Sequence, residues 1–173
     1  YFLQKISWLG QVTELTGVTV HPSPRLSDRV PFGTGRAVGD FMANGKLGTY
    51  PLQAYRDAKW LLGQVEVLWE TGRPSGAPPE AMGRFLGEEF VESVVPEIRA
   101  NSGDSMAFRK RFFRWFNAFR LMKFLNLARD EIHGPAEVEV AATELLEWMK
   151  LPRPILGSAV DLLRQFRRLE QEN

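Results

Sequence analysis

Residues that can bind phosphate are concentrated near the N-terminal end of the sequence, in the segment 18–40. A short β-branched run, VTV, leads into His21, and a stretch rich in glycine and arginine follows. Backbone N–H groups approach an anion closely where side chains are small, and guanidinium groups match phosphate oxygens in pairs. A histidine at the end of a strand can also ligate a divalent metal ion. The predicted binding residues are Arg25, Arg29, Gly33, Thr34, Gly35 and Arg36, and His21 is the predicted metal ligand.

The glycine spacing in this segment matches neither of the two best-known nucleotide-binding fingerprints. No Lys-Ser or Lys-Thr pair follows the glycines, and their spacing is not that of a dinucleotide-binding turn. The alternative interpretation is an ordinary loop in which Asp28 pairs with Arg25 or Arg29. Spacing alone favours this alternative.

A second candidate surface is the aromatic and basic segment 104–133, which we expect to form one long helix. Asp104 can cap its start and Gly134 can stop it. At helical spacing, one face holds the side chains Phe108, Phe112, Trp115, Phe116, Phe119 and Met122. Other apolar residues occupy the remaining faces, which is typical of a buried central helix. A protein partner, an anionic membrane surface or stacked bases are the functional alternatives. We expect burial and no nucleic acid, and membrane contact stays open.

The charge distribution supports the same interpretation. Between 105 and 129 there are seven basic residues and no acid. Because the net charge of the chain is +1, all other residues together carry −6. Glutamates cluster on both sides, at 80–97 and at 131–147. Ion pairs to these flanking segments could neutralise the basic helix within its own fold.

The end of the same helix turns polar, with Asn126, Asp130 and His133 on its main face. A carboxylate one turn from a histidine can orient the imidazole for acid–base chemistry. The ordinary alternative is a helix cap in which His133 meets the helix dipole and pairs with Asp130. We favour the cap.

The elements that must position these residues are mainly helical. A strand is expected at 17–22 and a glycine-rich loop from 23 to 48. Helices are expected from Pro51 to about Trp69, after Pro79 with a kink at Pro96, over 104–133, from Pro135 to about Lys150, and after Ser158. In the first of these, Tyr55, Ala58, Leu62, Val65 and Trp69 form one apolar stripe. The predicted fold class is mainly α: a bundle of about five to six helices with a short N-terminal β element and a Gly/Arg-rich loop.

Composition excludes several functional classes. The sequence contains no cysteine, which removes disulfide scaffolds, cysteine nucleophiles and zinc ribbons. No apolar run approaches the roughly 20 residues of a membrane-spanning helix. We therefore expect a cytoplasmic protein, with membrane association left open.

The first 45 or so residues resemble the end of the catalytic domain in family-two-type inverting glycosyltransferases of the GT-A fold. The run YFLQKISWLG resembles the acceptor-side helix just after its acidic pair, and VTVHPSPRLSDRVPFGTG resembles the strand and the arginine-bearing segment that follow. The nucleotide-binding half, the Asp-x-Asp motif and the catalytic acid of that family are not in this sequence. The resemblance therefore implies the C-terminal part of a longer enzyme, inactive alone.

The same resemblance implies roles for the candidate residues. His21 would ligate Mg²⁺ or Mn²⁺ in the full-length enzyme, while this fragment alone need not bind the metal. Arg25 and Arg29 would bind the diphosphate of a sugar nucleotide, and 32–35 would belong to a mobile loop closing over the donor. Residues 1–48 would be the remnant of the catalytic region and 49–173 a helical accessory region. The acceptor is not specified by the sequence, and a non-enzymatic helical interaction domain is the alternative function.

Overall fold

The computed structural model describes residues 34–46, 48–152 and 158–172, and this part of the chain is mainly helical, which confirms the predicted fold class. Contacts divide it into two units, 50–135 and 34–49 with 136–172. The first division lies beside the predicted boundary at 48/49. The residues after 135, however, group with the N-terminal segment rather than with the other helices. The predicted strand at 17–22 lies outside the described residues.

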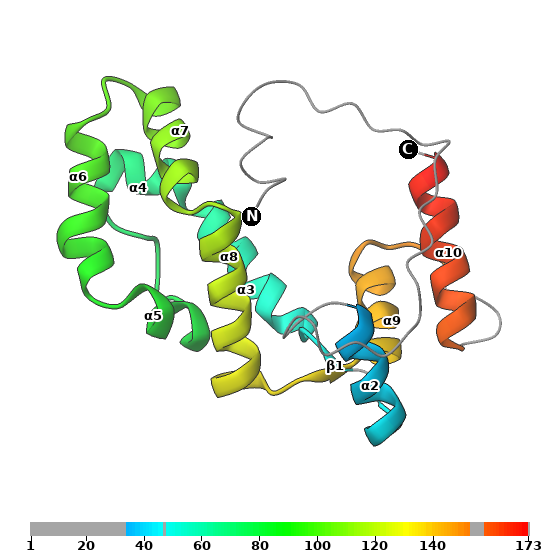
Figure 1. Ribbon diagram of the computed structural model, residues 1–173. Coiled ribbons are helices and arrows are strands. Elements are labelled where there is room, and N and C mark those ends of the chain that lie inside the picture. The colour runs from blue at the N-terminus through cyan, green and yellow to red at the C-terminus, as the bar shows by residue number, and fades with distance from the viewer. Residues whose placement is uncertain (1–33, 47, 153–157, 173) are drawn as a thin grey trace. The chain divides into compact units, whose positions relative to one another are not determined.

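The unit 50–135 is built from short helices, with its longest connection at 72–79 (Figure 1). In chain order these are α3 (Leu52–Gly63), α4 (Val65–Thr71), α5 (Glu80–Leu86), the π-helix η1 (Phe90–Val94), α6 (Val95–Ala100), α7 (Ser105–Trp115), α8 (Ala118–Leu127) and the π-helix η2 (Ala128–His133). Helix α7 packs against α4 and α6, while α8 packs against α3 and α5. The expected helix after Pro79 does not end at Pro96: α5 already ends at Gly87 (φ 63°), and Pro96 lies in the first turn of α6, where a proline fits without losing a helical hydrogen bond.

The expected helix from Pro51 to Trp69 is broken at Gln64 into α3 and α4. Its apolar stripe is also partly wrong, since Tyr55 and Leu62 are 39% and 42% exposed. The buried face of α3 contains Ala54, Ala58 and Leu61, together with the charged Asp57. The prediction placed only apolar residues in the core. It therefore left out Asp57 and assigned the neighbouring face of the helix to the core.

The expected single helix over 104–133 is wrong, because Phe116 leaves helical geometry at φ −89° and ψ 64°. Asn117 then caps α8: its Oδ1 accepts hydrogen bonds from the N–H groups of Phe119 and Arg120 at 3.0 and 3.1 Å. Asparagine forms such caps readily and is unfavourable inside a helix. The predicted cap at Asp104 is confirmed by its bond from the Ala107 N–H.

The break divides the predicted aromatic face. Phe108, Phe112 and Phe116 are buried, whereas Phe119 and Met122 are 44% and 45% exposed. Burial is therefore confirmed for α7 but not for this face of α8. Among the described residues, the largest fully buried side chains are phenylalanines. Phe108 packs against Trp69 of α4, while Phe112 and Phe90 of η1 both pack against Trp115 of α7.

The other unit contains α2 (Thr34–Asn44), β1 (Gly48–Thr49), β2 (Ala136–Glu137), α9 (Val138–Trp148) and α10 (Ala159–Glu172). The strands pair antiparallel with Gly48 opposite Glu137, and Lys46 forms an ion pair with Glu137 at 2.6 Å. The prediction of a loop is wrong for 34–44, which form a helix that ends at Gly45 (φ 67°). The predicted cap at Ser158 is confirmed, since its Oγ accepts a hydrogen bond from the Asp161 N–H.

Candidate functional site

Only some of the predicted phosphate-binding residues lie in the part of the chain that the structure describes. His21, Arg25, Arg29 and Gly33 lie outside the described residues, and so does the alternative pairing of Asp28. Thr34, Gly35 and Arg36 form the first turn of α2. Their backbone is therefore helical rather than part of a loop. Within the described residues, no group of three His, Cys, Asp or Glu side chains is placed to hold a metal ion.

The predicted pairing of Asp130 with His133 is wrong. Asp130 instead accepts two hydrogen bonds from the guanidinium of its neighbour Arg129, at 2.6 and 2.9 Å. These bonds lower the pKa of Asp130 and raise that of Arg129. One turn of helix separates Asp130 from His133, but π-helical winding in η2 and the adjacent guanidinium direct the carboxylate elsewhere.

His133 is paired with a carboxylate from a distant part of the sequence. Its Nε2 lies 2.8 Å from Oδ2 of Asp57, and Oδ1 of Asp57 accepts a hydrogen bond from Gln53 at 2.7 Å. Asp57 is 1% exposed, while the His133 side chain is 21% exposed. A buried carboxylate holding a partly exposed imidazole is a geometry that can support acid–base chemistry. Here it also joins α3 to η2, and we interpret its role as structural.

More polar contacts continue this junction toward the start of α3. The Tyr50 hydroxyl donates a hydrogen bond to Oδ1 of Asn126 at 2.9 Å, and the Arg129 guanidinium lies 5.1 Å from the centre of the Tyr50 ring. Tyr55 meets Tyr50 edge to face, and burial raises the pKa of its hydroxyl. The polar face predicted at the end of the helix is thus used for packing against α3.

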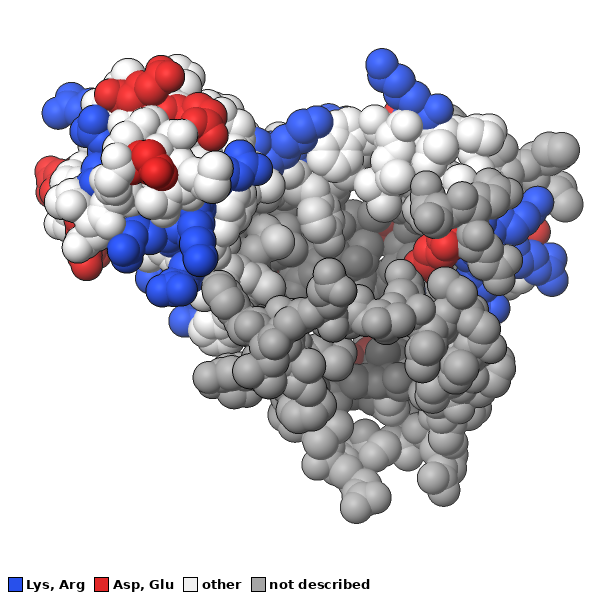
Figure 2. Space-filling model, turned by 90° about the horizontal axis from the view of Figure 1, so that it is seen from above, with Lys and Arg blue, Asp and Glu red and all other residues white. Residues whose placement is uncertain are grey.

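Within the described residues, ion pairs neutralise only part of the basic stretch. Arg109 pairs with Glu66 at 3.7 Å and Arg129 with Asp130, and neither acid belongs to the two glutamate-rich flanking segments. Arg120 and Lys123 lie over aromatic rings. In Figure 2, several basic side chains gather at the lower edge of the left-hand part of the picture, while acidic side chains lie at its top, in its centre and along its left edge. Positive charge therefore remains on part of this surface.

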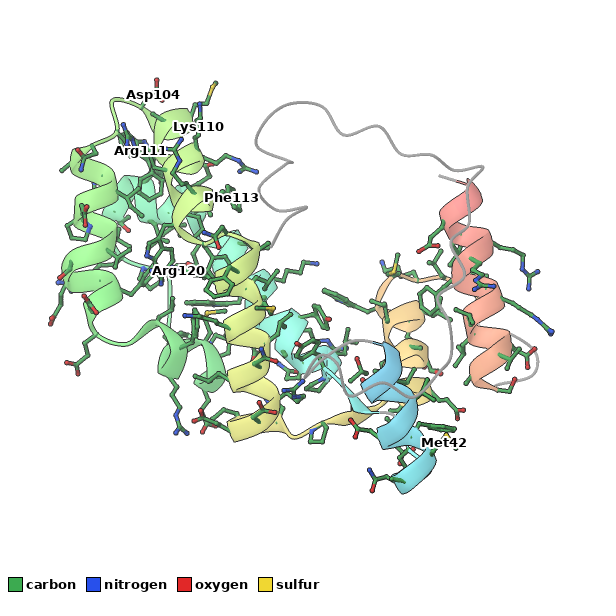
Figure 3. All side chains as sticks on the ribbon, in the orientation of Figure 1. Met42, Asp104, Lys110, Arg111, Phe113 and Arg120 are labelled. Carbon is green, nitrogen blue, oxygen red and sulfur yellow. The ribbon has the colours of Figure 1, made fainter. Side chains whose placement is uncertain are left out.

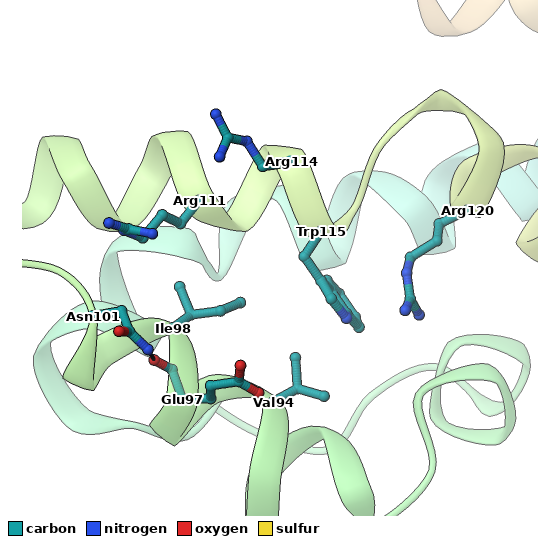
Figure 4. A pocket seen from close by; sticks show the side chains of 8 residues that line it. All are labelled: Val94, Glu97, Ile98, Asn101, Arg111, Arg114, Trp115 and Arg120. Carbon is teal, nitrogen blue, oxygen red and sulfur yellow. Dashed lines mark hydrogen bonds between the residues drawn. The ribbon is translucent and has the colours of Figure 1, made fainter.

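An open hollow of about 440 Å³ lies between α6 and the α7–α8 corner. One wall is formed by Val94, Glu97, Ile98 and Asn101, and the other by Arg111, Arg114, Trp115 and Arg120 (Figure 4). The guanidinium of Arg120 lies 4.5 Å from the centre of the Trp115 ring. Arg111 and Arg120 both lie on the side of their helices that faces α6, while Phe113 lies on the other side (Figure 3). The hollow thus combines positive charge with an aromatic and aliphatic floor.

Sequence reasoning identified the basic segment but missed this hollow. The arginines at 111, 114 and 120 stand in the sequence as part of one solvent-facing charge pattern. Their arrangement depends on the turn at 116–117, which places α8 beside the end of α7, and on the packing of α6. The signal available in the sequence was Asn117, which has a strong preference for capping and stands between two aromatic runs.

Two comparisons with sequences and one with structures gave no relatives: no family model, curated protein or solved structure matches this chain. Among the described residues, no helix combines the length and the apolar character required to cross a bilayer.

Proposed function

We propose that this chain is the C-terminal part of a sugar-nucleotide-dependent inverting glycosyltransferase. One observation carries the proposal: the residues predicted to face the donor diphosphate run directly into a helix N-terminus. Thr34, Gly35 and Arg36 form the first turn of α2, immediately after Gly33 in the sequence. First-turn N–H groups have no acceptor within the helix and, with the helix dipole, favour an anion such as a diphosphate.

The proposed contribution of this chain is to hold the leaving group. Arg25 and Arg29 would bind diphosphate oxygens through charge-assisted hydrogen bonds, and α2 would present its first-turn N–H groups. A divalent metal ion near His21 would supply further neutralisation of the departing diphosphate. The acid that activates the acceptor hydroxyl would come from the longer enzyme, so the chain alone should have no transferase activity.

The test is nucleotide binding by the longer enzyme. Arg25→Ala and Arg29→Ala should each weaken the binding of uridine or guanosine diphosphate, in the presence of Mn²⁺, by about tenfold, measured by isothermal titration calorimetry. Arg56→Ala is the matched control, because Arg56 is exposed on α3 and makes no ion pair with a described residue. Unchanged binding in both arginine variants, or an upstream sequence without an acidic pair, would contradict the proposal.

A second candidate function, a helical domain that binds an anionic membrane surface, is favoured by the exposed side of α8. Phe119 and Met122 are both about half exposed, and the Lys123 ammonium lies 4.8 Å from the centre of the Phe119 ring. Apolar side chains beside a basic residue suit the boundary between lipid head groups and acyl chains.

This candidate predicts a loss of vesicle binding in a double variant. Phe119→Ser with Met122→Ser should lower the partition of the protein onto phosphatidylserine vesicles at least about tenfold, measured by co-sedimentation at low salt. Val140→Ser is the control, since Val140 is 50% exposed on α9. Equal sedimentation of the wild type, the double variant and the Val140→Ser variant would rule out this surface as a membrane site. If the surface binds a protein partner instead, the wild type should not bind vesicles either.

A further inference from the structure

We propose that the hollow between α6 and the α7–α8 corner is a binding pocket for an organic phosphate. The inference is independent of the transferase proposal, because all of its residues lie within 94–120. It also concerns side chains other than those proposed to meet a membrane, Phe119 and Met122.

The first argument is charge. Among the described residues, three arginines and one glutamate line the hollow, so these side chains carry a net charge of +2. No ion pair joins Glu97 to Arg111 or Arg120 in the described part of the chain, and Arg111 makes no ion pair there at all. An excess of like charges raises the local potential, and a bound anion lowers it.

The second argument is the geometry of Arg120. Its guanidinium lies over the Trp115 ring at 4.5 Å, a contact that uses the flat face of the group. The N–H donors lie along the edge of a guanidinium and remain directed outward from such a stack. Arg120 and Trp115 come from α8 and α7, and Figure 4 shows both side chains extending toward the α6 side. The stack therefore holds a bidentate donor in place at the hollow.

The third argument concerns the class of anion. Guanidinium groups match phosphate oxygens in pairs, and Arg120, held on the Trp115 ring, presents such a pair of donors at the hollow. The volume of about 440 Å³ is within the range of small-molecule pockets and leaves room beside the phosphate for an organic group. Trp115, Val94 and Ile98 offer that group an apolar contact. The ligand is therefore a phosphate ester, either a soluble one or a lipid head group.

Glu97 provides an internal check on this assignment. Its carboxylate lies on the wall opposite the arginines and repels an anion in the hollow (Figure 4). Removing this charge should strengthen phosphate binding, whereas removing an arginine should weaken it. A ligand without negative charge would show neither effect.

Phenyl phosphate is the soluble probe, titrated into the full chain and followed by calorimetry and by NMR of the backbone and indole N–H groups. We expect phenyl phosphate to bind more tightly than inorganic phosphate and to shift the Trp115 indole signal. Arg111→Gln and Arg120→Gln should each weaken the binding about tenfold, and Glu97→Gln should strengthen it severalfold. Arg56→Gln, with the same loss of charge outside the hollow, should change little.

Phosphatidylcholine vesicles with and without phosphatidic acid form the second arm. Binding that requires phosphatidic acid and is lost in Arg111→Gln, with weak binding of phenyl phosphate, assigns the site to a lipid head group. Binding of phenyl phosphate without vesicle binding assigns it to a soluble ester. The proposal is overturned if neither probe binds, if Arg56→Gln loses as much as Arg111→Gln, or if Glu97→Gln weakens binding. Circular dichroism of each variant confirms that the fold is retained.

Discussion

Replacing His133 by alanine should lower the free energy of unfolding by about 3 kcal/mol. The reason is that the carboxyl group of Asp57, 1% exposed, would be left in the core with Gln53 as its remaining side-chain partner among the described residues. Removing one member of a buried pair costs more than the pair itself contributes, because the other charge is left without compensation. Urea unfolding followed by far-UV circular dichroism measures the loss.

Replacing Asp57, the other member of the pair, should lower the free energy of unfolding by less. Asp57→Asn keeps a polar group that can still meet Gln53 and His133, and the His133 side chain, at 21% exposure, can be solvated from outside. The exposed pair Arg129–Asp130 supplies the control, since Arg129→Ala should change the stability by less than about 1 kcal/mol. In a double-mutant cycle, the losses from Asp57→Ala and His133→Ala should add up to more than the loss of the double variant. A His133→Ala protein as stable as the Arg129→Ala protein would show that this pair does not stabilise the core.

The features that the sequence predicted well depend on residues close together in the chain. Asp104 caps α7, Ser158 caps α10, and Gly134, at φ 77°, ends η2. Each of these signals acts within one helical turn, so no knowledge of the tertiary fold is required. The break at Asn117 is equally local, but the continuous apolar pattern on both sides obscured it.

The contacts that sequence reasoning missed join distant residues. Asp57 and His133 are 76 positions apart, so nothing in local spacing connects them. The signal that was available is the position of Asp57 between Ala54, Ala58 and Leu61 on one helical face. A carboxylate in an apolar stripe requires a buried partner, and a histidine at a helix end is one of few candidates in a sequence with two histidines.

The candidate sites show the same difference between features set by nearby residues and features set by contacts between distant ones. Clustered arginines and aromatic residues were visible in the segment 104–133, but the hollow exists only because α7 stops at Trp115 and α6 supplies the opposite wall. Trp115, the last residue of α7, and Arg120 of α8 lie on either side of the turn at 116–117, and the guanidinium lies 4.5 Å from the centre of the indole ring. The proposed site therefore depends on this turn.

Phe112→Ala should be the most destabilising single substitution in the aromatic core, with an expected loss of about 3–5 kcal/mol. Phe112 is fully buried, and its ring lies between 5.6 and 6.3 Å from four others, centre to centre: Phe108, Phe113, Trp115 and Phe116. The cavity left by the ring would remove contacts with all of them. A loss of this size approaches the whole stability of an ordinary domain.

Because Phe112→Ala could unfold the protein outright, Phe112→Leu provides a milder variant with an expected loss of about 1–2 kcal/mol. Phe119→Ala is the matched control: its ring is 44% exposed on α8, so it should lose less than about 1 kcal/mol. Trp115 packs on Phe112 at 5.9 Å and lines the hollow, so Phe112→Leu should also weaken phenyl phosphate binding in a protein that remains folded. Equal stability of the Phe112→Leu and Phe119→Ala proteins would show that the core is not centred on α7. A folded Phe112→Leu protein with undiminished binding would show that the hollow does not depend on the aromatic cluster behind it.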